Sequence, residues 1–215
     1  LVSYFLSLAS LLFLLNLFLI NFLTSWIVLL GVSIFLFGFA FKNARAQGGA
    51  FDARYWIALL FVALSIVMIM MRSPIIESIA IPAEVAPSFR ATIGIARGVL
   101  SEGWKQILFG NGPGLFELDW AKYKDPAINQ TVFWGVRFIQ GSSWFSTLIS
   151  TFWILGTLGF LLFLAVAFFS FLRVILAYGT GESSLPTGLF LAFVSLLLSF
   201  FLYPGNYTSV LLLFL

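Results

Sequence analysis

The sequence predicts an all-helical, polytopic membrane protein. Of its 215 residues, 61% are hydrophobic and 9% are charged, whereas soluble domains carry roughly 45–50% apolar and about 25% charged residues. The mean hydropathy is +1.09, and the first charged residue is Lys42. A membrane-spanning segment satisfies its backbone hydrogen bonds internally, and no barrel-like alternation is visible, so the spanning segments are expected to be helices.

The uncharged residues 1–41 predict two helices. A single helix of this length would extend about 62 Å, roughly twice the hydrocarbon core of a bilayer. We expect the two helices at about 2–21 and 25–41, separated by a short polar stretch. After a loop at 42–54, a third helix is expected at about 55–71.

Residues 72–143 hold most of the charge and form a predicted hydrophilic domain. Uncharged stretches after this domain predict helices at about 144–172 and 187–203 and the start of another at 209–215. The first of these is long enough to tilt in a bilayer. Because the chain starts without Met and ends within an apolar run, we expect a fragment of a longer protein, with five to six spans here.

Basic residues in the short loops predict the orientation. The loop at 42–54 carries three basic residues, and the loop at 173–186 carries Arg173. Both loops lie on one side if three helices precede the large domain, and the positive-inside rule assigns that side to the cytoplasm. Residues 72–143 are therefore expected to be extracytoplasmic.

The composition also restricts the chemistry. The chain has no His and no Cys, which removes the commonest general base, the commonest metal ligand and thiolate chemistry. Eleven basic and eight acidic residues give a net charge of +3, too even to indicate a nucleic-acid partner. We therefore expect no metal, no cofactor and no nucleic acid, and membrane lipids as the surroundings.

An amphipathic helix is predicted at about 88–109 within the hydrophilic domain. Arg90, Arg97 and Lys105 fall on one stripe of this helix. Two guanidinium groups on one face form a fork suited to phosphate oxygens, and Gly94 between them would let a bulky ligand approach the backbone. The alternative is a solvated basic face on a helix that lies along the membrane surface.

A glycine-rich turn follows this helix, Gly110-Asn-Gly112-Pro-Gly114. Its backbone N–H groups, those of Gly112 and Gly114 among them, could gather an anion. The alternative is a helix C-cap followed by a proline turn.

Acidic and aromatic residues alternate after the turn. Trp120 and Tyr123 could stack on sugar rings, and Glu117 and Asp119, like Glu102 before the turn, could accept hydroxyl groups or protons. The alternative is a polar connector whose aromatic side chains lie at the depth of the lipid headgroups.

The residues from Arg90 through the turn Gly110–Phe116 to Trp153-Ile154-Leu155-Gly156 resemble the bacterial O-antigen ligase and polymerase-like membrane proteins. Members show an Arg about twenty residues before a Gly-x-Gly-x-Gly-x-Phe turn, followed by a membrane helix with Gly-Ile-Leu-Gly. Here Trp153 replaces the first Gly of the helix motif.

The resemblance implies a GT-C-like glycosyltransferase of the bacterial cytoplasmic (inner) membrane. Such proteins take glycan from an undecaprenyl-diphosphate carrier at the outer face and pass it to a glycan, lipid or protein acceptor. The family Arg at the position of Arg90 contacts the diphosphate. Ligase members carry a His-Asn pair at the positions of Ser142 and Ser143, so a polymerase, a divergent ligase and an inactive member all stay open.

A metal-independent mechanism follows as a hypothesis. Fixed cations would stabilise the charge on the departing diphosphate, namely Arg90 and Arg97, supported by Lys105 and Arg137. Glu102, Glu117 and Asp119 are the acids available to receive the proton of the acceptor hydroxyl. The alternatives are a non-catalytic structural or assembly protein and a transporter component.

Overall fold

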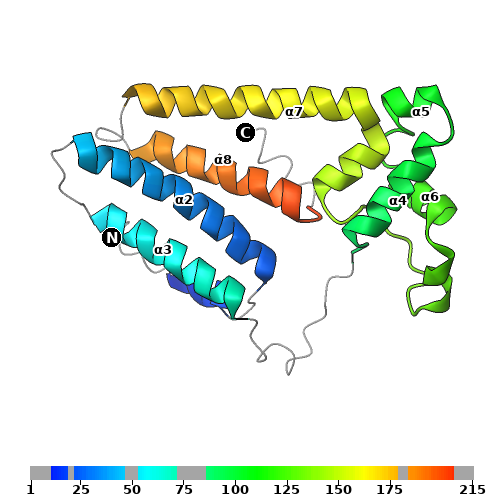
Figure 1. Cartoon of the computed structure of the whole chain (residues 1–215), viewed down its shortest axis with the longest axis horizontal. Helices are drawn as coiled ribbons and strands as arrows, with labels where there is room; N and C mark the ends of the chain where they lie inside the picture. The colour runs from blue at the N-terminus through cyan, green and yellow to red at the C-terminus, as the bar shows by residue number, and fades with distance from the viewer. Residues whose placement is uncertain (1–10, 19–21, 47–52, 72–85, 179–183, 206–215) are drawn as a thin grey trace. The chain divides into compact units, whose positions relative to one another are not determined.

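The computed structural model describes residues 11–18, 22–46, 53–71, 86–178 and 184–205. These parts are helical, with no strand among them (Figure 1). Residues 11–18 form a short helix. The other elements are α2 (Leu23–Ala46), α3 (Ala53–Met70), α4 (Phe89–Leu100), α5 (Trp104–Phe109), α6 (Phe116–Tyr123), the 3₁₀ helix η2 (Pro126–Gln130), α7 (Trp144–Tyr178) and α8 (Ser184–Leu202).

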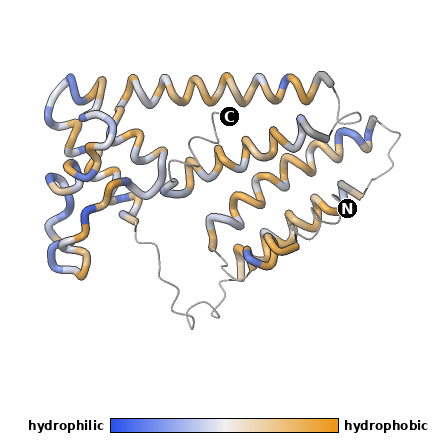
Figure 2. The backbone as a smooth tube through the Cα atoms, turned by 180° about the vertical axis from the view of Figure 1, so that it is seen from behind, coloured by the Kyte–Doolittle hydropathy of each residue, from blue (hydrophilic) through white to orange (hydrophobic). Residues whose placement is uncertain are grey.

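Among the described residues, two helices are long and apolar enough to cross a membrane, Leu23–Arg45 within α2 and Trp144–Leu176 within α7. Shorter apolar helices run over Tyr55–Met70 and Pro186–Leu202. Figure 2 shows hydrophobic residues along these helices and hydrophilic ones gathered around α4 to α6. The helix expected at 209–215 and much of that at 2–21 lie outside the described residues.

The chain divides into two compact units. The first unit holds α2, α3 and the beginning of α8, up to Ser195. Within it α2 packs along α3, and the rings of Phe35 and Phe39 meet that of Phe190 edge to face, each with centroids 5.7 Å apart. Aromatic packing of this kind joins α2 to α8.

The second unit holds α4 to α7, η2 and the end of α8. Its hydrophilic part has a small core of Ile95, Phe116 and Trp120. The ring of Phe138 meets that of Trp120 edge to face at 4.8 Å. This core holds α6 against the buried face of α4.

The helix expected over about 88–109 is two helices in the structure. Ser88 caps the start of α4, because its side chain accepts a hydrogen bond from the amide of Ala91 at 3.1 Å. The chain leaves the helix after Leu100 and restarts at α5, with Gly103 before it at φ 153°. A single continuous basic stripe was therefore the wrong expectation, because Lys105 belongs to α5.

Helix α7 is interrupted at Trp153, which has φ 47° and ψ −146°. The expected continuous helix at 144–172 is therefore a short segment, 144–152, followed by a long one that starts at residue 154. Four hydroxyl-bearing residues at the start of α7 are buried: Ser143, Ser146, Ser150 and Thr151. Helix α7 packs against α4 and α5.

The glycine-rich turn packs on α7 directly before this interruption. The amide of Gly112 donates to the carbonyl of Thr151 at 3.0 Å, a carbonyl that an unbroken helix would pair with the amide of Leu155. Gly110 has φ 68°, and a side chain there would overlap the same carbonyl. The turn thus caps the end of the short segment.

Candidate functional site

A groove of about 840 Å³ lies between α4 and residues 123–131. Arg90 and Arg97 of α4 line one wall, and Lys124 and Asp125 line the other. The two arginines are seven residues apart, which corresponds to about 10 Å along the helix axis. The arrangement brings together the two arginines that the sequence predicts to share a face.

The groove also has an apolar lining, to which Phe89, Ile93 and Ile128 contribute. The ring of Phe89 is 61% exposed. Cations and apolar side chains therefore line the same open groove, an arrangement that matches an amphiphilic anion better than a simple hydrophilic one.

The charge of the groove is positive. Neither Arg90 nor Arg97 makes an ion pair with any other described residue, and both are exposed. The ammonium group of Lys124 donates to the carbonyl of Trp134 at 2.7 Å. The carboxylate of Asp125 accepts from the amide of Ala127 at 2.9 Å and caps η2. Three cations thus face one carboxylate that already has a structural partner.

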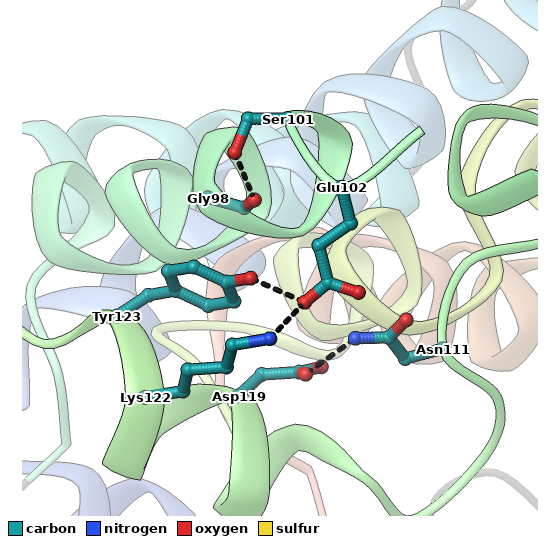
Figure 3. A network of polar contacts seen from close by, with 7 residues as sticks. All are labelled: Gly98, Ser101, Glu102, Asn111, Asp119, Lys122 and Tyr123. Carbon is teal, nitrogen blue, oxygen red and sulfur yellow. Dashed lines mark hydrogen bonds and ion pairs between the residues drawn. The ribbon is translucent and has the colours of Figure 1, made fainter. Parts of the chain in front are cut away.

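Tyr123 forms part of the groove wall and connects it to Glu102. The ring of Tyr123 lies on Gly98, where any side chain would overlap it. Its hydroxyl donates to Oε1 of Glu102, and the ammonium group of Lys122 donates to the same oxygen at 2.6 Å (Figure 3). Oε2 of Glu102 has no partner among the described residues.

These two hydrogen bonds shift the proton affinities of the cluster. The ammonium group of Lys122 and the hydroxyl of Tyr123 lower the pKa of Glu102. The same contacts with Glu102 raise the pKa of Lys122 and that of Tyr123. Glu102 is therefore an ionised hydrogen-bond acceptor near neutral pH, and a weak base.

Asp119 is the buried carboxyl of this cluster, only 3% exposed. Its Oδ1 accepts from Nδ2 of Asn111 at 2.7 Å (Figure 3), while Oδ2 is buried with no partner among the described residues. Loss of hydration raises its pKa. Its proton affinity suits a general base, but its burial keeps it from the groove.

Two residues expected near a diphosphate, Lys105 and Arg137, and one candidate proton acceptor, Glu117, lie outside the groove. Lys105 lies over the ring of Trp104, 5.9 Å from its centroid, and Arg137 pairs with Glu117 at 3.5 Å. Neither Lys105 nor Arg137 lines the groove. Glu117 is held by this ion pair and does not line the groove either.

Trp120 is buried, contrary to expectation, and the glycines of the turn do not line the groove. Trp120 is 3% exposed and its indole N–H donates to the carbonyl of Val136 at 3.2 Å, so its faces are not open to a sugar. The amide of Gly112 is engaged with Thr151. Gly114 is exposed with φ 77°, outside the groove lining.

Ser142 and Ser143 lie at the start of α7. The side chain of Ser143 accepts from the amide of Ser146 at 3.1 Å, as an N-cap does. The amide of Ser142 donates to the hydroxyl of Thr92 at 3.1 Å. These bonds give the two serines a structural role in anchoring α7 to α4.

Lys124 and Asp125 are groove residues that the sequence alone did not indicate. Lys124 follows Lys122 by two residues in the stretch where acidic and aromatic residues alternate. This alternation is the sequence feature that could have indicated Lys124. Helix α6 ends at Tyr123. Lys122, within the helix, pairs with Glu102, whereas Lys124, directly after it, lines the groove.

Comparisons of the chain with protein-family models, curated proteins and solved structures gave no match.

Proposed function

We propose that the chain is a glycosyltransferase-type membrane enzyme of the GT-C kind. It transfers or polymerises glycan from an undecaprenyl-diphosphate-linked donor at the outer face of the bacterial cytoplasmic membrane. The groove between α4 and residues 123–131 holds the diphosphate of the donor. One observation carries the proposal: Arg90, Arg97 and Lys124 line the same open groove as Phe89, Ile93 and Ile128.

The chemistry of the donor fits this lining. A polyprenyl diphosphate carries adjacent anionic phosphates on an apolar chain, so it requires cations and apolar contacts in one place. Guanidinium groups bind phosphate oxygens through paired hydrogen bonds. When the glycosidic bond to the diphosphate breaks, negative charge grows on the leaving oxygen, and fixed cations lower that barrier.

Glu102 is our candidate for the residue that receives the acceptor hydroxyl. It is exposed, and it borders the groove through its hydrogen bond with Tyr123. Its lowered pKa suits a hydrogen-bond acceptor that orients the hydroxyl more than a base that removes its proton completely.

Alanine substitution of the groove arginines tests the proposal. R90A and R97A should each weaken binding of a lipid-linked oligosaccharide about tenfold, since a hydrogen bond to a charged group contributes about 1.5 kcal/mol. K105A is the matched control, because that cation is exposed but outside the groove. Binding is measured with the chain in nanodiscs, and equal affinity of all three variants and the wild type would contradict the proposal.

A non-catalytic lipid-diphosphate-binding assembly protein is the second candidate. It is favoured by the burial of Asp119 and by the lowered pKa of Glu102, which leave the groove without a strong base. A transfer assay on the wild type and the E102Q variant separates the two candidates. An enzyme should lose glycan transfer with donor binding retained, whereas an assembly protein should show donor binding and no transfer even in the wild type.

A further inference from the structure

We infer that Gly94 is the point at which a phosphate group of the ligand contacts helix α4, and that it thereby determines which ligands the groove accepts. The inference rests on the proposed function, which it makes more specific. It follows from a glycine whose presence the protein structure alone does not explain.

Glycine inside a helix is less favourable than alanine, because it loses more backbone freedom on folding. Five other described glycines of this unit have a steric reason, Gly98 and Gly141 among them. A side chain at Gly98 would overlap the ring of Tyr123, and one at Gly141 would overlap Thr92. At Gly94 no atom lies within 4 Å of the position that a Cβ would take, and its φ is not positive.

The position of Gly94 explains its small size. It is exposed, it lines the groove, and it lies on the helix face between Arg90 and Arg97. Along the axis it is about 6 Å from the first and about 4.5 Å from the second. A phosphate group over Gly94 can therefore be reached by both guanidinium groups at once.

The contact itself is with the helix backbone. Amides in the middle of a helix are already bonded within the helix, so the phosphate oxygens meet the Cα–H group, at a carbon–oxygen distance of about 3.3–3.6 Å. A methyl group at this position would displace the phosphate by about one bond length, roughly 1.5 Å. Displacements of about 1 Å are enough to weaken a positioned interaction strongly.

The G94A variant therefore has two effects of opposite sign. Helix α4 gains a better helix former without a new clash, so the thermal midpoint of unfolding should be equal or higher. Affinity for a diphosphate should fall at least fivefold, because the displaced phosphate is no longer in position to bind both guanidinium groups. A merely structural glycine would not give increased stability together with reduced binding.

The experiment measures equilibrium binding to the full chain in nanodiscs with two probes, inorganic pyrophosphate and a short-chain prenyl diphosphate. G135A is the matched control, since Gly135 also has open space at its Cβ position and no positive φ, and lies outside the groove. We expect weaker binding of both probes for G94A and unchanged binding for G135A. Weaker binding of the prenyl probe alone would instead assign the contact to the lipid chain and overturn the phosphate contact.

The failure of this inference is distinguishable from failure of the proposed function. If R90A and R97A weaken binding and G94A binds as the wild type does, Gly94 has no part in recognition and the groove assignment stands. If none of the three variants changes binding, the proposed function is wrong and the Gly94 inference falls with it.

Discussion

Two carboxyl groups of one small cluster have opposite protonation preferences. Glu102 is exposed and bonded to an ammonium group and a hydroxyl, which lower its pKa. Asp119 is buried with one oxygen lacking a partner among the described residues, and loss of hydration raises its pKa. Environment and not residue type therefore decides which of the two carboxyl groups holds its proton more tightly.

The stability of the chain should depend on pH in a way that reflects the raised pKa of Asp119. Its folded pKa lies above the ordinary value of 3.8, so the folded state holds the proton more tightly than the unfolded state. The contribution of Asp119 to stability is greatest below pH 3.8 and falls as the pH rises through the folded pKa, by about 1.4 kcal/mol for each pH unit between the two values. D119N should remove this decrease, as measured by thermal unfolding between pH 3 and 7.

The E102Q variant supplies the contrast, because the contribution of Glu102 to stability depends on pH in the opposite direction. The lowered pKa of Glu102 stabilises the fold above its ordinary pKa of 4.5, and this stabilisation disappears as the pH falls through the folded pKa. E102Q should therefore be less stable than the wild type at pH 7 and equally stable in strong acid. Identical pH profiles for D119N and wild type would mean that Asp119 is hydrated.

The placement of a residue was predictable from the sequence where it depends only on neighbours along the same helix. The shared face of Arg90 and Arg97 follows from helical periodicity over seven positions, and the structure agrees. The roles of Trp120 and Asp119 were not predictable, because their burial depends on α4 packing against α6. The same short-range reasoning cannot find Glu102 beside Lys122, which lies 20 positions away.

At the scale of elements, the two helix interruptions matter most for the site. Hydropathy runs without a charge through Trp153, so the sequence predicts a continuous helix there. At the break, the carbonyl of Thr151 accepts a hydrogen bond from the amide of Gly112, a partner from a distant part of the chain. Helix existence was therefore predictable for α2, α3, α7 and α8, and helix continuity was not.

The glycine turn gives a sharp test of this contact. In G110A the new side chain meets the carbonyl of Thr151, and the φ of 68° is also unfavourable for alanine. G114A changes a residue with φ 77° but open space around it. We expect a loss of about 1 kcal/mol for G114A and at least about 3 kcal/mol for G110A, measured by chemical unfolding in detergent. Equal losses of unfolding free energy in G110A and G114A would show that Gly110 is not in close contact with α7.

At the scale of the whole molecule, the sequence correctly predicts an all-helical chain with helices apolar enough to cross a membrane. Two such helices are present in the part of the chain that the structure describes. Orientation depends on the few basic residues of the short loops, and it stays a prediction.

Cysteine labelling tests the orientation directly, because the chain has no cysteine of its own. Single cysteines at Arg45, exposed near the end of α2, and at Asn129, exposed in η2, report the two sides. A maleimide that cannot cross membranes should label N129C in intact cells and R45C only after lysis. The reverse pattern would put the groove in the cytoplasm and exclude an outer-face donor.

The interruption of α7 at Trp153 also determines how thick a bilayer the helix can match. An unbroken rod of 35 residues would measure about 53 Å, against a hydrocarbon core of about 30 Å. From residue 154 onward roughly 25 residues remain, about 38 Å, an excess that a moderate inclination absorbs. The bend therefore relieves hydrophobic mismatch, and it leaves the first, hydroxyl-rich turns free to pack against protein instead of lipid.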